Sequence, residues 1–281
     1  IIYWYIFLRS FIPLYSLLRK NSPDYFIAQL ITSLPLVLNY IFSFRFKFIL
    51  RISGLPKLNY LRKFLWKITL KKIFVVTCPT AGTVNYLKEF NIRIDKIKLL
   101  YDPIISSQEI MDKKREKNDI SNLFPKSYFI SIGRLTKQKN FLFLLSCFNN
   151  LVKTKYKDLK LVLIGEGELK MQLENFIKKN NLEKNVYLLG FKKNIFKYLK
   201  DSRGLISSSL WEDPGFVLIE AAYLNIPIIS SNCKNGPEEI LDHGNNGVIF
   251  ESNNSNSFVQ QFNQFMNLHP TEINKFKVKA K

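Results

Sequence analysis

The strongest constraint on this fold is a repeated alternation of short apolar runs with longer helix-like runs. The alternation occurs twice along the 281 residues, once on each side of a polar stretch. Strands joined by helical crossovers lie parallel in one sheet, with helices over its faces. The sequence therefore predicts an α/β fold with two doubly wound, Rossmann-like parallel-sheet domains.

The first half of the chain supplies four predicted strands. The predicted strands are residues 24–30, 46–53, 72–79 and 96–103, and the predicted helices are residues 34–44, 58–72 and 80–90. The last of these helices follows Thr80, a residue type that favours the N-cap position.

A polar and charged stretch, residues 106–122, then breaks the pattern and is predicted to be a linker. The alternation restarts after it. The later strands begin at residue 128 and continue at 159–165, 186–190, 204–209, 226–231 and 247–250, with helices at 141–155, 168–180, 194–200 and 215–224. We expect an N-terminal domain at residues 1–110, a linker at 111–125 and a C-terminal domain at 126–281.

The formal net charge of +20 indicates an anionic partner, which could be nucleic acid, a membrane surface or a substrate. A lysine-rich composition with solvated side chains explains the excess equally well. Nucleic acid is disfavoured, because neither RNP-like aromatics nor a zinc-ligand spacing occurs. The three cysteines lie far apart and are predicted to be free buried thiols.

The N-terminal segment, residues 1–18, is apolar and aromatic but is interrupted by Arg9 and Pro13. It fits an interfacial helix, with Tyr3, Trp4 and other aromatics at the lipid head groups, as well as it fits a buried helix of the first domain. Residues 45–72 contain nine Lys or Arg and no acid. Together these stretches predict peripheral binding to an anionic membrane at its cytoplasmic face.

Two loops after predicted strands carry polar residues suited to an anionic ligand. The loop SIGRLTKQKN places Arg134 and Lys139 ahead of a helix N-terminus, which favours a diphosphate, although a basic surface loop would look the same. The loop GEGEL has glycines that permit close backbone approach to a ligand. Glycine is nevertheless common in such turns.

The most informative segment is WEDPGFVLIEAA. Glu212 stands in the loop after a strand, and Glu220 stands in the second turn of the next helix. A carboxylate there can accept hydrogen bonds from two ribose hydroxyls, and the N–H groups at the helix start suit a sugar or a phosphate. An acidic loop followed by an ordinary helical glutamate is the alternative interpretation.

Taken together, SIGRLTKQKN, LVLIGEGEL, VYLLGF, EDPGFVLIEAA and NGPEEIL resemble glycosyltransferase family 4, the retaining transferases of GT-B fold. The resemblance is strong over residues 128–250 and loose before them. It implies two domains facing a cleft and a nucleotide-sugar donor. It also indicates a fragment lacking its first strands, since the chain begins with Ile1 and the glycine-rich loop near the family's N-terminus is not visible.

The resemblance assigns the nucleotide contacts residue by residue. Arg134 and Lys139 correspond to the pair that holds the donor diphosphate, and Glu220 corresponds to the acid that binds the ribose. Gly190 and Phe191 correspond to the strand-end position beside the base.

Contacts to the transferred sugar follow in the same way. Glu212 corresponds to the catalytic acid near the sugar, and Asp213, Pro214, Gly215 and Phe216 correspond to the loop around it. The family more often has Gly-Phe-Gly after the acid. Proline here removes one N–H donor, which changes the expected sugar contacts.

The implied activity is retaining transfer of a sugar to a glycan or lipid-linked acceptor, in surface polysaccharide or lipopolysaccharide assembly. No cofactor or metal is expected, because no D-x-D motif occurs and two cations can hold the diphosphate. A GT-B relative with other chemistry, such as an epimerase or a phosphorylase, and a non-enzymatic binder of anionic surfaces remain as alternatives.

Overall fold

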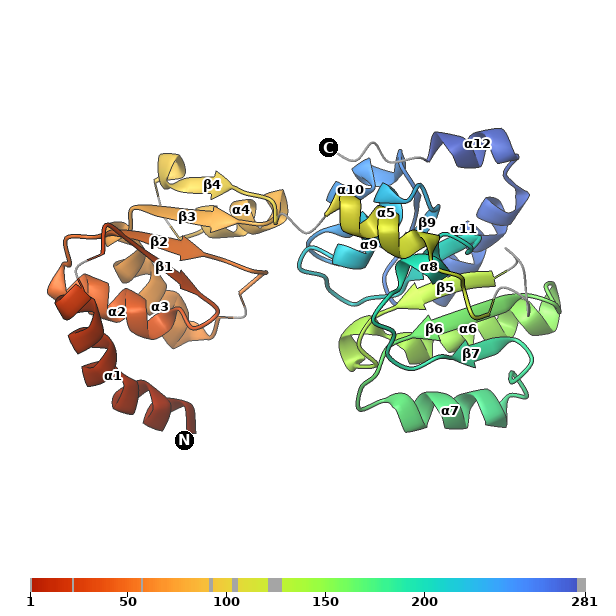
Figure 1. Cartoon of the computed structure of the whole chain (residues 1–281), viewed down its shortest axis with the longest axis horizontal. Coiled ribbons are helices and arrows are strands. Elements are labelled where there is room, and N and C mark those ends of the chain that lie inside the picture. The colour runs from red at the N-terminus through yellow and green to blue at the C-terminus, as the bar shows by residue number, and fades with distance from the viewer. Residues whose placement is uncertain are drawn as a thin grey trace. The chain divides into compact units, whose positions relative to one another are not determined.

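The computed structural model describes residues 2–21, 23–56, 58–90, 93–102, 106–120 and 128–276. The chain divides into two compact units, Ile1–Asp102 and Pro103–Lys281, and each is built on its own parallel sheet (Figure 1). The predicted α/β class with two parallel-sheet domains is confirmed. The division falls after Asp102, whereas the sequence placed a linker at residues 111–125.

The sheet of the first unit has consecutive strand order, β1-β2-β3-β4. Its elements are β1 (Tyr25–Gln29), α2 (Ser33–Phe42), β2 (Lys47–Arg51), α3 (Tyr60–Thr69), β3 (Val75–Cys78), α4 (Ala81–Lys88) and β4 (Ile97–Leu99). Right-handed crossovers between successive neighbours place their helices on one face of a sheet. Ala28 and Leu50 on that face are buried, whereas Tyr25 and Ile27 on the other face are more than half exposed.

Helix α1 (Ile2–Asn21) packs one side against this core. Leu18 is buried, and four partly buried residues at helical spacing line the same side, namely Phe7, Phe11, Leu14 and Tyr15. Its other side exposes Tyr5, Leu8 and Ile12. The interpretation as a helix packed on the first domain is therefore confirmed for one side, and binding at a membrane interface stays a prediction. The side chains of Tyr3 and Trp4 lie outside the described ones. Among the described helices, none is long and apolar enough to cross a bilayer.

The sheet of the second unit has the order β10-β9-β8-β5-β6-β7. Its strands are β5 (Tyr128–Ile132), β6 (Lys160–Ile164), β7 (Val186–Leu188), β8 (Gly204–Ser207), β9 (Ile228–Ser231) and β10 (Val248–Phe250). The chain runs from β5 out to β7 and then returns to β8 on the other side of β5. The boundary between β5 and β8 is therefore a topological switch point.

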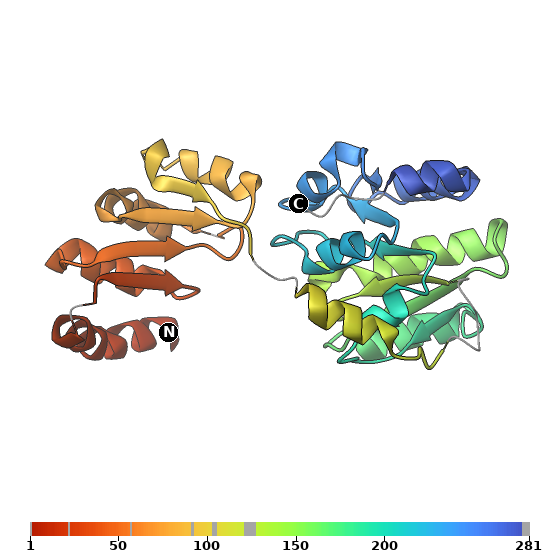
Figure 2. The same cartoon turned by 45° about the horizontal axis from the view of Figure 1, so that its top comes forward.

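Both faces of the second sheet are covered by helices (Figure 2). Phe129 and Leu161 point into a core shared with α6 (Phe141–Thr154), α7 (Lys170–Lys179) and α11 (Ser255–Asn267). Their neighbours in the strands, such as Ile130 and Val162, point into a core on the opposite face. Helices α5, α8, α9 and α10 cover that face, at Ser107–Arg115, Phe196–Leu199, Phe216–Tyr223 and Pro237–Ile240.

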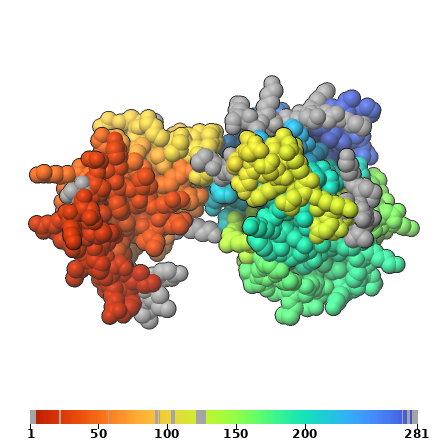
Figure 3. Space-filling model, in the orientation of Figure 1, coloured from red at the N-terminus to blue at the C-terminus, as the bar shows by residue number. Residues whose placement is uncertain are grey.

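Three helices were not predicted from the sequence. Helix α5 lies in the stretch predicted to be a linker, where Ser106 caps it by accepting a hydrogen bond from Glu109 N. It belongs to the second unit, on whose surface it lies in Figure 3. Ile110 is buried in the core of that unit, and Asn194 Nδ2 donates to Lys113 O. Helices α11 and α12 (Pro270–Lys275) follow the last strand, beyond the last element predicted from the sequence.

Candidate functional site

A cavity of about 350 Å³ opens at the carboxyl ends of β5 and β8, at the switch point of the second sheet. Its walls are the loop after β5 and the loop between β8 and α9. The lining residues are Gly133, Arg134, Gln138, Lys139, Glu212, Asp213, Gly215, Phe216 and Val217. Ligands of open α/β sheets bind at this position, because the loops at a switch point diverge and leave a crevice.

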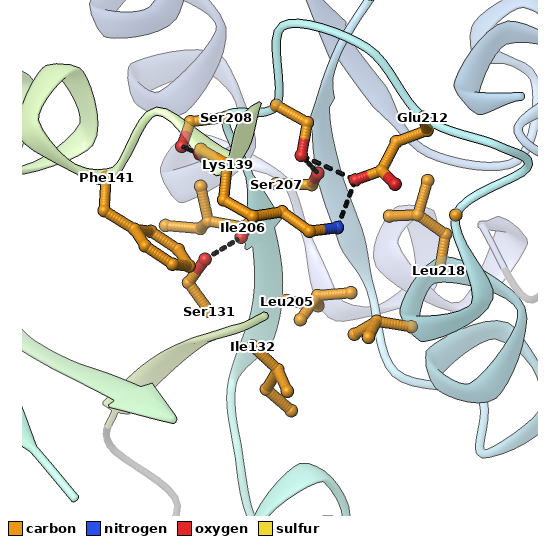
Figure 4. A pocket seen from close by; sticks show the side chains of 13 residues that line it. Ser131, Ile132, Lys139, Phe141, Leu205, Ile206, Ser207, Ser208, Glu212 and Leu218 are labelled. Atoms are coloured by element: carbon orange, nitrogen blue, oxygen red, sulfur yellow. Dashed lines mark hydrogen bonds and ion pairs between the residues drawn. The ribbon is translucent and has the colours of Figure 1, made fainter. Parts of the chain in front are cut away.

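The centre of the site is an ion pair between these two loops. Lys139 Nζ lies 2.6 Å from Glu212 Oε1, and the side chains are 16% and 6% exposed. The same carboxylate oxygen accepts a second hydrogen bond from Ser209 Oγ at 2.5 Å. In Figure 4, dashed lines mark both hydrogen bonds to one carboxylate oxygen of Glu212, and the second oxygen points away from them. A largely buried charge is thus paired and hydrogen-bonded.

Glycines allow the loop after β5 to lie close to its neighbours. A Cβ atom on Gly133 would lie 2.8 Å from Lys139 Cε, so the lysine stem runs across this glycine. A Cβ atom on Gly165 would lie 1.9 Å from Gly133 O. A larger residue therefore cannot stand at position 165 unless the backbone moves. Gly165, the first glycine of GEGEL, therefore permits close approach between two loops. The predicted approach of this loop to a ligand stays a prediction.

The loop between β8 and α9 is held on both sides. Leu210 N donates to Gln138 O, and Gln138 Nε2 donates to Trp211 O. On the other side, Glu212 N donates to the main-chain oxygen of Lys234.

The segment after β9 completes this support. Asn235 Nδ2 donates to Asp213 Oδ1 at 2.8 Å. A Cβ atom on Gly236 would lie 1.9 Å from Pro214 O, so this glycine is required by the packing of the two loops. The Asp213–Pro214 peptide bond is cis, and Pro214 is buried.

Glu220 lies on α9, outside the lining of the cavity. Burial raises the pKa of its carboxyl group to about 7, and the positive charge of Lys113 opposes part of that shift. A carboxyl group with its pKa near neutrality changes charge within the physiological range.

Gly190 follows β7, and its oxygen accepts from Gly165 N. The next residue, Phe191, is 73% exposed. The structure therefore leaves an accessible aromatic ring at the strand end predicted to border the base.

Six of the ten site residues predicted from the sequence line the cavity: Arg134, Lys139, Glu212, Asp213, Gly215 and Phe216. The other four, Gly190, Phe191, Pro214 and Glu220, lie outside its lining. Sequence reasoning missed Gln138, Ser209 and Asn235, which hold the loops together. The signal available for Ser209 was the serine run before Glu212, and for Asn235 it was the NGPEEIL motif.

All three cysteines are free and buried, as predicted, and burial raises the pKa of each thiol to about 12. Within the described part of the chain, no cluster of three or more His, Cys, Asp or Glu side chains is placed to hold a metal ion.

Residues 112–281 match the family model of glycosyl transferases group 1. The chain belongs to this family. The matched range falls within the second unit and contains the whole cavity described above. The resemblance noted from the sequence motifs is thereby confirmed.

Similarity to two individual members of the family covers 48% and 78% of the chain. An N-acetylgalactosamine-N,N'-diacetylbacillosaminyl-diphospho-undecaprenol 4-alpha-N-acetylgalactosaminyltransferase of Campylobacter jejuni is 32% identical over 223 residues, which are 78% of this chain and 59% of that protein. An uncharacterised glycosyltransferase of Methanocaldococcus jannaschii is 49% identical over 135 residues, or 48% of this chain and 33% of that one. This group 1 member thus spans between a third and three fifths of the length of these curated relatives.

The fold is also found among solved structures. The crystal structure of Anabaena Alr3699/HepE in complex with UDP superposes with a TM-score of 0.76 and 16% identity, covering 95% of this chain and 76% of that one. At this level of identity the comparison establishes the fold, which is the GT-B plan of two parallel-sheet domains.

Proposed function

We propose that this chain transfers a sugar from a uridine diphosphate sugar to an acceptor hydroxyl. The observation that carries this proposal is the cavity at the switch point of the second sheet, where two cations, Arg134 and Lys139, and the carboxylate of Glu212 line one space. The cations suit the diphosphate, and the first N–H groups of α9 suit an anion or a sugar oxygen. Glu220 is the ribose ligand, and Phe191 borders the base.

The proposed transfer retains the configuration at the anomeric carbon. The bond from that carbon to the diphosphate breaks, and the acceptor oxygen forms its bond on the same face. The acceptor proton passes to the departing phosphate oxygen, so the protein needs no general base. Arg134 and Lys139 stabilise the charge on the leaving diphosphate without a metal, and Glu212 stabilises the positive charge that develops on the sugar ring.

We further propose a glycan or lipid-linked acceptor of surface polysaccharide assembly, reached at an anionic membrane on its cytoplasmic face. The relative from Campylobacter jejuni carries a diphospho-undecaprenol acceptor in its name, which supports a lipid-linked acceptor. In the first unit, an exposed stripe of residues on α3 supports the proposal of membrane binding. Its residues are Tyr60, Lys63, Phe64, Lys67 and, just past the helix end, Lys71. Their helical spacing places aromatic rings and ammonium groups on one surface, as interfacial helices require.

Calorimetry with UDP tests the donor site. Arg134→Ala and Glu220→Ala should each weaken UDP binding at pH 8 by roughly tenfold to a hundredfold, as expected for the loss of charge-assisted hydrogen bonds. Lys137→Ala is the matched control, because Lys137 is an exposed cation of the same loop that does not line the cavity. Unchanged affinity in both site variants would refute the assignment.

A further inference from the structure

Ser209 makes a contact to the proposed catalytic carboxylate that the proposed function does not yet use. Its hydroxyl donates to Glu212 Oε1, the oxygen that also accepts from Lys139 Nζ. Ser209 and Glu212 are only 1% and 5% exposed, so water cannot replace this hydrogen bond freely. Both partners therefore bind one oxygen and leave the other for a ligand.

Ser209 is itself held firmly. It lies two residues past the end of β8, and its main-chain oxygen accepts a 2.6 Å hydrogen bond from Ser231 Oγ at the end of β9. The position of its hydroxyl is thus set by two adjacent strands of the sheet. A short, buried side chain whose main chain is anchored to a strand positions a partner better than a long flexible one does.

Lys139, by contrast, has a second role in the proposed function. It lines the cavity together with Arg134, where the donor diphosphate is expected. A diphosphate attracts the ammonium group more strongly than one carboxylate does, because it carries more charge. Once the donor binds, Lys139 becomes shared with the phosphates, and the neutral hydroxyl of Ser209 becomes the contact that still fixes Glu212.

We propose that Ser209 is a positioning residue for the transfer step. It holds Oε1 of Glu212 so that Oε2 faces the transferred sugar after Lys139 has turned to the diphosphate. This inference rests on the proposed function, since it assumes a nucleotide-sugar donor in the cavity. A hydrogen bond that orients a group in the transition state affects kcat more than it affects ground-state binding.

The test compares Ser209→Ala with Ser131→Ala. Ser131 is an equally buried serine of the same sheet, but its hydroxyl donates to the main-chain oxygen of Ile206 and not to Glu212. The probes are UDP, for affinity, and UDP-glucose, UDP-galactose and their N-acetyl forms, for release of UDP. The sugar nucleotide that the wild type turns over fastest is then used for kcat and KM.

Ser209→Ala should lower kcat about thirtyfold, the loss expected when a hydrogen bond to a charged group is removed. KM and the affinity for UDP should stay within about twofold of wild type, and Ser209→Thr, which keeps the hydroxyl, should recover most of the loss. Ser131→Ala should change kcat by no more than about twofold. If Ser209→Ala does not fold, Ser209→Cys has nearly the same size but donates weakly, and should show the same loss.

Three results would overturn the proposal: unchanged kcat in Ser209→Ala or in its folded Cys substitute, an equal loss in Ser131→Ala, or a fall in UDP affinity as large as the fall in kcat. A wild-type protein that neither binds UDP nor turns over any of the four sugar nucleotides would remove the proposed function and this inference together. If the wild type binds UDP and turns over a sugar nucleotide but kcat is unchanged in the Ser209 variants, only this inference is refuted.

Discussion

The two sheets of this chain differ in the order of their strands. The first runs consecutively from β1 to β4, whereas the second reverses direction between β5 and β8. The first carries its described helices on one face, and the second is covered on both faces. The reversal separates two loops at one end of the second sheet, and the described cavity with its cations and carboxylate lies between them.

Each unit nevertheless has an ion pair at the carboxyl ends of its strands. In the first unit Arg51 pairs with Asp102 and also donates to the main-chain oxygen of Leu100. In the second unit Lys139 pairs with Glu212. Similar pairs thus occur in two topologies, but only the second pair borders the described cavity. Topology therefore decides whether a polar pair supports structure alone or also a site.

The largest expected effect is a difference in turnover between changes at Glu212 and at Asp102. Glu212→Gln keeps the shape of the side chain but loses its charge, so turnover of the sugar nucleotide should fall roughly a hundredfold or more, as for loss of one electrostatic contact to a transition state. Asp102→Asn in the first unit should change turnover by less than about threefold. Steady-state release of UDP measures both. A large rise in donor KM with unchanged turnover in Glu212→Gln would contradict its catalytic role.

The next effect concerns stability. Lys139→Met leaves the buried Glu212 without its cation and should lower the free energy of unfolding by about 3 kcal/mol, as for other broken buried pairs. Arg51→Met should cost about 2 kcal/mol, since Asp102 is more exposed than Glu212. Urea unfolding measures both losses, and calorimetry should show weaker UDP binding for Lys139→Met alone. Equal weakening of UDP binding by Arg51→Met would contradict the assignment of only the Lys139–Glu212 pair to the nucleotide site.

A smaller effect should appear in the pH dependence of binding. Because burial raises the pKa of Glu220 to about 7, its carboxylate form is lost as the pH falls through that value, and with it the acceptor for the ribose hydroxyls. The affinity for UDP-glucose, whose diphosphate does not titrate in this range, should fall about tenfold from pH 8 to pH 6. Glu220→Gln should bind weakly at both values, and a parallel fall in this variant would show that another group titrates.

The same pKa shift of Glu220 predicts that folding stability depends on pH in the opposite direction to binding. An acid whose pKa is higher in the folded state favours folding most at low pH, so the contribution of Glu220 to stability should decrease as the pH rises from about 4.5 to 7. Subtracting the profile of Glu220→Gln from that of the wild type isolates this contribution. A contribution that increases with pH would contradict the assigned burial.

The smallest effect per residue concerns the membrane. Each lysine near an anionic leaflet contributes about 1 kcal/mol, so Lys63→Gln, Lys67→Gln and Lys71→Gln together should weaken liposome binding strongly at low salt, although each alone costs about fivefold. The matched control changes three exposed lysines of the second unit, Lys153, Lys178 and Lys179, to Gln. Co-sedimentation with anionic vesicles over a salt series distinguishes them. Equal losses would mean that net charge alone drives binding.

Much of the candidate site could be predicted from the sequence, because its residues lie in the loops that follow strands. Arg134, Lys139 and Glu212 stand shortly after β5 and β8, and strand ends of a parallel sheet meet at one edge. The N-cap of α4 was also predictable, since Thr80 accepts a hydrogen bond from Thr83 N as its position suggested. Local pattern and family spacing were sufficient for these residues.

Other features depended on contacts that no local pattern records. Gln138 meets Trp211 across 73 positions, and Asn235 meets Asp213 across 22. Helix α11 was missed because its surface is rich in Asn, Gln and Ser. Its buried phenylalanines, Phe258, Phe262 and Phe265, do stand at helical spacing behind the cap at Asn254. The strand order of the second sheet was also unavailable, since the sequence gives strands and not their neighbours.

The hydrogen bonds that connect the loops around the cavity have a consequence for the entropy of binding. Main-chain and side-chain bonds already fix the loops at Gln138, Glu212 and Asn235. Conformational freedom that was given up on folding does not have to be given up again when a ligand arrives. Nucleotide binding should therefore carry only a small unfavourable entropy from loop ordering, and loosening a loop by Asn235→Ala should reduce affinity through entropy while the enthalpy of contact stays nearly the same.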